Sequence, residues 1–399
     1  MDPERADDRP GFGAFATALF FLILPAAATA GAMALAVLQG VFGVLATPLR
    51  NLRPRSALNW AFLISLLAFV AYVCATSLWS RNPNHAQAWR LSAGVACGLL
   101  FAAGAAANDG GRRLTRAVGV AAIAVTAAML LGEAFANMPL NRIGQPHTET
   151  GLLMRNPARG ASVLMCLTWA GIATLAAGSS FQRLTWRGIM VATGVLAFQF
   201  DQSANAIAFG FGLIAYVLAY SAPRLTIMGL CAGLAAWLIA APWVILHAHI
   251  PAAFMARLPD SWAIRTSIWQ FASTQIEAHP VLGLGLDSAR TFPQIGHIRN
   301  LTFNLIPLHP HSASLQIWLE TGVVGAVLGA LCLLIGGAAL SSALRQDRLA
   351  AAAAAGTIAC IGLIANVSYG AWQEWWVATA FAAAALVSAT RRHVGEDED

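Results

Sequence analysis

The sequence contains no lysine, and charged residues of any kind are scarce. Only 11% of the 399 residues are charged, against roughly 25% in a typical soluble domain, whereas 58% are hydrophobic. This balance excludes an ordinary soluble globular protein. Repeated apolar stretches of about 20 residues, each long enough to cross a bilayer as a helix, instead predict an all-α polytopic membrane protein with a single membrane domain over residues 1–399.

Several signatures of cofactor chemistry are also missing. The six cysteines lie in apolar stretches and never in CxxC spacing, which argues against a disulfide framework or a zinc site. No HExxH, DxD, Walker or SxxK motif occurs, and GLGLDS at Gly283–Ser288 lacks the GxGxxG spacing of a nucleotide fingerprint. The N-terminal residues mix acids and arginines, so no cleavable signal peptide is expected. We expect no metal, cofactor or nucleic acid to bind.

The apolar stretches divide into about twelve candidate transmembrane spans, with Pro25 and Gly31 marking the turn between the first two. The seventh span is short for a full crossing. The predicted spans are residues 12–27, 29–47, 57–78, 91–108, 117–135, 159–177, 188–200, 203–221, 226–246, 312–338, 349–367 and 372–389.

The distribution of arginine orients these spans. With a cytoplasmic N-terminus, 15 of the 24 arginines fall on the inner side and 9 on the outer side, in agreement with the positive-inside rule. Both termini are then cytoplasmic, and residues 391–399 form an acidic cytoplasmic tail. The inner arginines include Arg5, Arg9, Arg50, Arg53, Arg55 and Arg392. The outer arginines are Arg81, Arg90, Arg142, Arg155, Arg159, Arg257, Arg265, Arg290 and Arg299.

The longest outer connection is the loop at residues 247–311. Its segment FMARLPDSWAIRTSIWQFASTQIEA spaces apolar residues as an amphipathic helix does, and the pattern breaks at Pro280 and Gly283. We expect one or two helices here that lie on the membrane face and cover a cavity.

Two histidines precede the tenth span, in the segment HPHSASLQIWLETG. If the helix begins near Ser312, His311 lies at its outer end, where the helix dipole disfavours the charged imidazolium. A neutral ring can accept a proton. Glu320 falls on the opposite face of the helix, so a dyad with His311 is not expected. The alternative is a pair of interfacial histidines, His309 and His311, with a packing glutamate. The glycines Gly322, Gly325 and Gly329 are typical of close helix packing.

Arg159 opens the sixth span in the segment RNPARGAS. Asn156 can cap this helix and Pro157 can start it, which places a guanidinium at a helix N-terminus. That combination favours an anion, although snorkelling to lipid phosphates is the better explanation when Arg159 is considered alone.

Arg265 lies on the apolar side of the amphipathic stretch in the large loop, where an arginine needs a partner. A bidentate phosphate contact would supply one, and a salt bridge to Asp260 or Glu277 is the alternative. Arg90 and Arg155 are weaker candidates of the same kind.

Three tryptophans occur in the segment YGAWQEWWVATA near the end of the chain. Tryptophans of this kind normally anchor helices at the interface, and we expect that role for Trp372, Trp375 and Trp376. Glu374 among them could contact a sugar or an arginine.

Taken in order, RGASVLMCLTWA, SWAIRTSIWQF, HPVLGLGLDS, HPHSASLQIWLETGVVG and AWQEWW resemble the O-antigen ligase family of bacterial inner-membrane proteins and the related polysaccharide polymerases. The histidine motif carries most of the resemblance. The family usually has His-Asn or a similar pair there, and this chain has His311 followed by Ser312, with Leu315, Gln316, Glu320 and Gly322 in place.

The resemblance implies a metal-independent glycosyltransferase of the GT-C type that acts at the periplasmic face. The donor would be a glycan on undecaprenyl diphosphate, and the acceptor a lipid A-core sugar in a membrane of ordinary lipids. The family's arginines fall on Arg159 and Arg265, which would bind the diphosphate, and its essential histidine on His311, which would act as the base of an inverting transfer. Further candidates for substrate binding are His309, Arg90, Arg155, Gln316 and Glu374.

Two rival functions remain from the sequence. A polymerase of the same superfamily would use a second lipid-linked glycan as acceptor. A transporter for lipid-linked sugars would place charged residues at mid-membrane, but Glu133 and Glu320 are the only acids well inside apolar spans.

Overall fold

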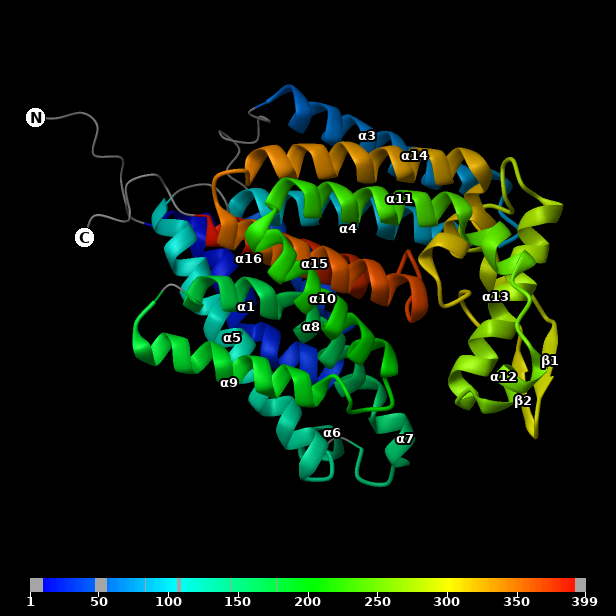
Figure 1. The fold of residues 1–399 in the computed structure, drawn as a ribbon, viewed down its shortest axis with the longest axis horizontal. Helices are drawn as coiled ribbons and strands as arrows, with labels where there is room; N and C mark the ends of the chain where they lie inside the picture. Colours follow the sequence, from blue (N-terminus) through cyan, green and yellow to red (C-terminus); the bar gives the residue numbers. More distant parts are fainter. Residues whose placement is uncertain are drawn as a thin grey trace, which may run out of the picture.

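The computed structural model describes residues 10–46, 56–82, 84–105, 109–143, 145–176 and 178–391. It consists of a bundle of long helices and a smaller cap at one end (Figure 1). The bundle helices are α1 (Phe12–Gly31), α2 (Ala34–Ala46), α3 (Ala57–Ala75), α4 (Ala86–Ala105), α5 (Asp109–Phe135), α8 (Arg155–Ala176), α9 (Ser180–Leu196), α10 (Ser203–Ser221), α11 (Pro223–His247), α14 (Ala313–Ala343), α15 (Arg348–Val367) and α16 (Glu374–Thr390). Two short helices, α6 (Pro139–Ile143) and α7 (Thr150–Leu153), lie between α5 and α8.

Each predicted span coincides with one of these bundle helices, which confirms the all-α polytopic membrane fold. Among the described residues, nine helices are long and apolar enough to cross a membrane. The helices α2, α9 and α16 are shorter, with 13, 17 and 17 residues, so the count of twelve spans stays a prediction.

Helix ends follow local capping chemistry, and some differ from the predicted ends. Ser179 starts α9 with a capping box, so this helix begins eight residues before the predicted 188. Pro25 was expected to mark a turn, but it lies inside α1, which continues to Gly31. The arginines Arg5, Arg9, Arg50, Arg53, Arg55 and Arg392, and the acidic tail after Arg391, lie outside the described residues.

The centre of the bundle is α8, which packs against α1, α5, α9, α15 and α16. Its Trp169 is fully buried and lies against Gly212 of α10 and Gly356 of α15, where an added Cβ would collide with the ring. The glycines of α10 and α15 thus let these helices approach the bulky side chain on α8 closely. Close packing of this kind holds helices together in a membrane, where the hydrophobic effect does not drive them to associate.

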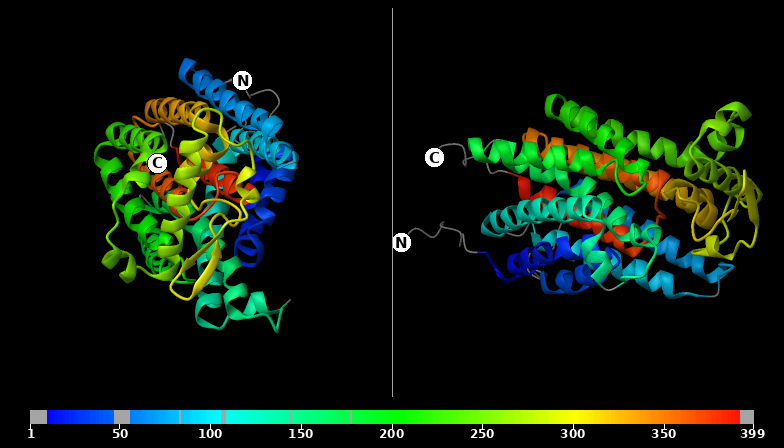
Figure 2. Two further views of the ribbon diagram at one scale, coloured as in Figure 1. Left: turned by 90° about the vertical axis from the view of Figure 1, so that its right-hand side faces the viewer. Right: turned by 90° about the horizontal axis from the view of Figure 1, so that it is seen from below.

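The cap is formed by residues 248–311, and it covers one end of the bundle (Figure 2). It contains α12 (Ala252–Arg257), α13 (Asp260–Ala278), the short 3-10 helix η2 (Ser288–Thr291), and an antiparallel hairpin of β1 (Ile295–Ile298) and β2 (Leu301–Asn304). The helices were expected and the hairpin was not. Arg299 at the hairpin turn pairs with Asp260 and donates to the Leu258 carbonyl at 2.8 Å, which ties the hairpin to α12 and α13.

The helix α14 is broken at Gly322, whose backbone has φ 63° and ψ −163°. The cap segment after α13 satisfies the backbone groups at this break. Val323 N donates to the Pro280 carbonyl at 2.8 Å, and Leu284 N donates to the Leu319 carbonyl at 2.9 Å. The expectation that Gly322 serves only helix packing is therefore wrong, because only glycine adopts this backbone readily.

Candidate functional site

His311 lies directly before the start of α14, as predicted, and Ser312 is the N-cap residue. Its Nδ1 lies 2.7 Å from the carbonyl oxygen of Ser368, in the connection between α15 and α16. A carbonyl only accepts, so Nδ1 carries the proton. In the neutral ring, Nε2 then keeps a lone pair and is the atom that can accept a proton.

The surroundings of His311 keep it neutral. Burial lowers its pKa below 6.5, the positive charge of Arg265 lowers it further, and the hydrogen bond to Ser368 acts in the opposite direction. The sequence analysis expected the helix dipole to lower the pKa of His311, and burial and Arg265 lower it as well. A general base requires the neutral imidazole that results.

His309 lies beside His311, with the ring centroids 4.5 Å apart in an edge-to-face arrangement. Its side chain is 7% exposed. The backbone N–H of His311 donates to His309 Nδ1 at 3.1 Å, and the amide of Gln373 lies 3.0 Å from His309 Nε2. Burial, His311 and Arg290 lower the pKa of His309 to about 3, so it stays neutral.

Arg159 and Arg265 come from α8 and α13, and both interact electrostatically with the Tyr369 phenol. Tyr369 follows Ser368, the residue that accepts from His311. Tyr369 therefore brings the two arginines and the histidine to the same end of the bundle, although Arg159 and His311 are 152 positions apart in the sequence. Burial raises the pKa of the Tyr369 phenol above 10, so its hydroxyl remains a hydrogen-bond donor.

Arg265 carries no ion pair in the described part of the chain. Its guanidinium carbon lies 5.4 Å from the centroid of the Trp262 ring, and burial lowers its pKa. Asp260, one of the expected salt-bridge partners, pairs with Arg299 instead, and Glu277, the other, is exposed. The salt-bridge alternative for Arg265 is therefore wrong, and its charge is available to a ligand.

The weaker arginine candidates, Arg155 and Arg90, are both exposed. Arg155 is exposed at the first turn of α8, and Asn156 lies within that turn, where its amide donates to the Ala30 carbonyl at 2.8 Å. The prediction that Asn156 caps α8 and Pro157 starts it is wrong, because the helix begins at Arg155. Arg90 is exposed and lies 3.7 Å from Glu374, so Glu374 contacts an arginine.

Gln316 and Glu320 belong to a buried network that joins α14 to the cap and to the connection before α16. Gln316 donates to Glu320 at 3.1 Å and accepts from Ala371 N at 2.8 Å. The other oxygen of Glu320 accepts from Trp372 Nε1 at 2.7 Å and from Asp287 N at 2.8 Å. The polar atoms of the Gln316 and Glu320 side chains are thus hydrogen-bonded within the protein. This indicates that the two residues stabilise the structure around the site.

The connection Ser368–Gln373 was missed as a functional element. Ser368 accepts a hydrogen bond from His311, and Gln373 lies within hydrogen-bonding distance of His309. Tyr369 interacts electrostatically with Arg159 and Arg265. The available signal was a polar stretch, SYGAWQ, between two apolar spans. The tryptophans around it were expected at the membrane interface, and that interpretation is wrong. Trp372, Trp375 and Trp376 are only 6%, 1% and 4% exposed, because they pack inside the bundle.

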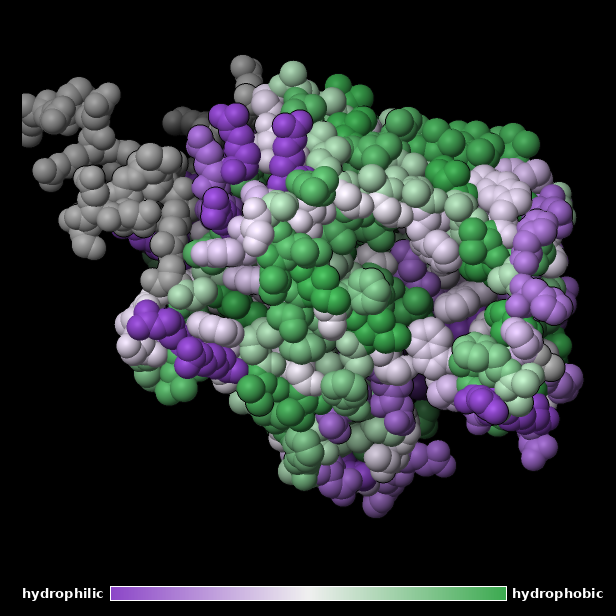
Figure 3. Space-filling model, viewed as in Figure 1, coloured by the Kyte–Doolittle hydropathy of each residue, from purple (hydrophilic) through white to green (hydrophobic). Residues whose placement is uncertain are grey.

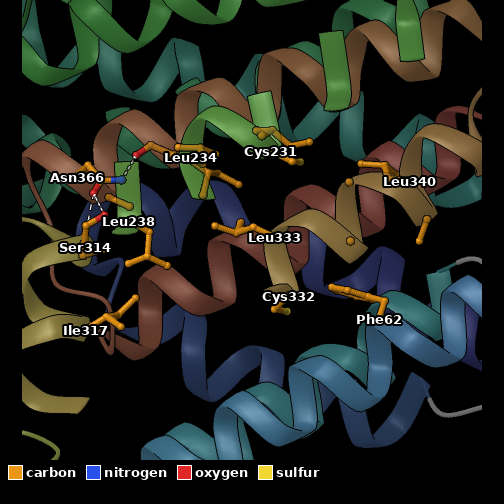
Figure 4. A pocket seen from close by; sticks show the side chains of 18 of the residues that line it. Phe62, Cys231, Leu234, Leu238, Ser314, Ile317, Cys332, Leu333, Leu340 and Asn366 are labelled. Carbon is orange, nitrogen blue, oxygen red and sulfur yellow. Dashed lines mark hydrogen bonds between the residues drawn. The ribbon is translucent and has the colours of Figure 1, made fainter. Parts of the chain in front are cut away.

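The surface between the bundle and the cap is hollowed, and hydrophilic residues lie in its depth (Figure 3). On the bundle itself, an apolar cavity of about 640 Å³ lies among α3, α11, α14 and α15. Ser314 and Asn366, joined by a 2.6 Å hydrogen bond, lie at one end of it, and Phe62 and Leu340 lie at the other (Figure 4). Ser314 is close in the chain to His311, so this cavity begins near the polar site and extends along the membrane-spanning helices.

Comparisons with known proteins find relatives of the kind that the sequence motifs indicated. A family model described as O-Antigen ligase matches residues 188–330. A candidate polysaccharide ligase of Rickettsia conorii is 28% identical over 230 residues, which are 55% of this chain and 54% of the relative. One from Rickettsia felis is 25% identical over 229 residues, or 55% of each chain. One from Rickettsia typhi is 28% identical over 238 residues, or 58% of this chain and 57% of the relative.

The aligned segments span about half the length of these curated relatives. The family match includes Arg265, His309 and His311, whereas Arg159 lies before it. The match covers the cap and the first part of α14, where the sequence motifs had indicated the resemblance. Over residues 188–330, the chain is thus similar to the O-antigen ligase family, as its sequence motifs indicated.

Proposed function

We propose that this protein is a membrane glycosyltransferase of the O-antigen ligase type. It transfers a glycan from undecaprenyl diphosphate to a sugar of the lipid A-core acceptor, at the periplasmic face of the bacterial inner membrane, with a GT-C type of organisation. The observation that carries the proposal is the state of His311. Its Nδ1 is committed to the Ser368 carbonyl, and its Nε2 is left to accept a proton beside Arg265.

The reaction is a direct displacement. A hydroxyl oxygen of the acceptor attacks the anomeric carbon of the donor while the bond from that carbon to the diphosphate oxygen breaks. The electron pair of the broken bond stays on the diphosphate, and the hydroxyl proton moves to Nε2 of His311. Attack from the side opposite to the leaving group inverts the configuration at the anomeric carbon.

Arg159 and Arg265 stabilise the negative charge that develops on the diphosphate. Both approach Tyr369 from different helices, and Arg265 is held by the Trp262 ring in a partly buried position. Charge stabilisation by fixed donors is stronger where water is excluded, because the effective dielectric constant is lower. Two guanidinium groups can supply this stabilisation without a metal ion.

The apolar cavity provides a place for the polyprenyl chain of the donor. Its lining is almost entirely hydrocarbon, and its polar end at Ser314 and Asn366 lies next to the start of α14. A chain bound there directs the attached diphosphate toward His311 and the arginines. With the cap on the periplasmic side, the arginine clusters that the sequence analysis assigned to the inner side fall on the cytoplasmic side, in agreement with the positive-inside rule.

The product identifies the reaction. Purified protein in lipid nanodiscs is supplied with undecaprenyl diphosphate-linked glycan and lipid A-core, and the products are separated by gel and mass spectrometry. Glycan attached to lipid A-core supports a ligase, and elongated lipid-linked glycan without such attachment indicates a polymerase. Movement of unaltered donor between leaflets without either product contradicts an enzyme. Incubation with EDTA should leave the rate unchanged, and inhibition that Mg²⁺ reverses would contradict metal independence.

A further inference from the structure

The hydrogen bonds of His309, which lies beside His311, indicate what this residue does. His311 adopts a left-handed backbone conformation with φ 53°, which a residue other than glycine rarely takes. The backbone N–H of His311 donates to Nδ1 of His309 at 3.1 Å. The ring of His309 thus supplies the acceptor that this unusual backbone requires.

Gln373 fixes the other side of the His309 ring. Because Nδ1 accepts, the neutral ring carries its proton on Nε2, which lies 3.0 Å from the amide of Gln373. The amide oxygen of Gln373 otherwise has no partner among the described residues. Exchanging the positions of its oxygen and nitrogen, which have the same shape, lets Nε2–H donate to that oxygen and satisfies both groups.

The remaining faces of His309 leave little room for a substrate. An added Cβ on Gly370 would lie 2.9 Å from Cγ of His309, so the backbone of the α15–α16 connection packs against the ring. The ring of His311 covers another side, edge-to-face. Both ring nitrogens and most of the ring surface of His309 are therefore used within the protein.

We infer that His309 is a positioning residue, which holds the backbone of His311 in its left-handed conformation and is itself oriented by Gln373, without touching the substrate. The inference rests on the proposed role of His311 as base. It predicts that an acceptor at the position of Nδ1 is the property of His309 that matters. Asparagine provides this acceptor, because its Oδ1 is attached to Cγ as Nδ1 is in histidine, whereas leucine fills similar space without an acceptor.

The kinetic test compares His309→Asn with His309→Leu in the nanodisc transfer assay. We expect His309→Asn to keep kcat within about threefold and His309→Leu to lower kcat by at least about tenfold, because small misplacements of a catalytic group are costly. KM should change little in either variant, and the dependence of kcat on pH should keep its shape. The inference would be overturned if kcat fell equally in both variants. It would also be overturned if the variants raised KM and left kcat unchanged.

A second measurement does not depend on glycan transfer. Carbethoxylation of His311 by diethyl pyrocarbonate is followed by mass spectrometry in wild-type protein and in both variants, after gel filtration shows that each is folded. The rate should be the same in wild type and His309→Asn and should change in His309→Leu. Equal rates in all three would refute the positioning role. If the wild-type protein transfers no glycan but the modification rates follow this pattern, the proposed function fails and the positioning inference stands.

Discussion

The two parts of α14 on either side of Gly322 differ in character. The part from Ala313 to Thr321 buries Gln316 and Glu320, and each is hydrogen-bonded to groups from other elements. The part from Val323 to Ala343 contains no charged residue, and several of its side chains line the apolar cavity. One helix therefore joins a polar site to a hydrocarbon-lined space.

This difference shows which polar groups are available for chemistry. Buried polar groups in a membrane protein are costly unless they have partners, and Gln316 and Glu320 are fully partnered. In the described ranges, His311 Nε2 and the guanidinium groups of Arg159 and Arg265 have no such protein partners. These are the groups that we propose act on the substrate.

The largest expected effect is at the polar end. His311→Ala should lower the rate of glycan transfer by about 10²–10⁴-fold, because it removes the base. Initial rates in nanodiscs measure the effect, and His297→Ala, at an exposed histidine of the β-hairpin, is the matched control. Full activity in His311→Ala would show that another group takes the proton.

Removing one arginine should have the next largest effect. Arg265→Gln should lower kcat by about 10²–10³-fold, the usual cost of losing one donor to a developing negative charge. Arg257→Gln, in the last turn of α12, serves as the control. If the two variants lose activity equally, the net charge of the cap matters and the position of Arg265 does not.

A smaller effect is expected at the apolar end. Leu333→Trp narrows the cavity in Figure 4, and it should raise KM for a donor with a long polyprenyl chain by about tenfold, equivalent to roughly 1.4 kcal/mol of binding. A donor with a short chain should be affected little. Leu331→Trp places the same bulk at an exposed position of α14 outside the cavity. An equal rise in KM for both donors would place the chain elsewhere.

The smallest expected effect is a shift in pH dependence. Burial and Arg265 lower the pKa of His311 below 6.5, and His309 beside it is neutral, so the neutral base persists as the pH falls to 6.5. The value of kcat/KM should therefore decline only below pH 6.5. Arg265→Gln removes a positive charge and should move this decline to higher pH. A pH profile measured on the residual activity of that variant tests the sign, and a shift to lower pH would contradict it.

Much of the fold followed from local sequence. Apolar stretches of about 20 residues predicted the helices, and the serine at position 312 predicted where α14 begins. The histidine motif and the lone arginine in an amphipathic stretch directed attention to His311 and Arg265. Errors arose where a residue could satisfy two local patterns. The tryptophans of the AWQEWW segment match an interfacial anchor, yet they are buried, because composition alone does not show which helices surround α16.

Hydrophobicity and capping act over a few neighbouring residues, so local sequence was enough to predict the membrane-spanning class, the position of most helices and the residue types at their ends. The partners of those residues depend on tertiary packing. The carbonyl that sets the tautomer of His311 belongs to Ser368, 57 positions along the chain, and the break at Gly322 is satisfied by Pro280 and Leu284. Such partners are chosen by the packing of whole helices, which brings distant backbone groups within hydrogen-bonding distance.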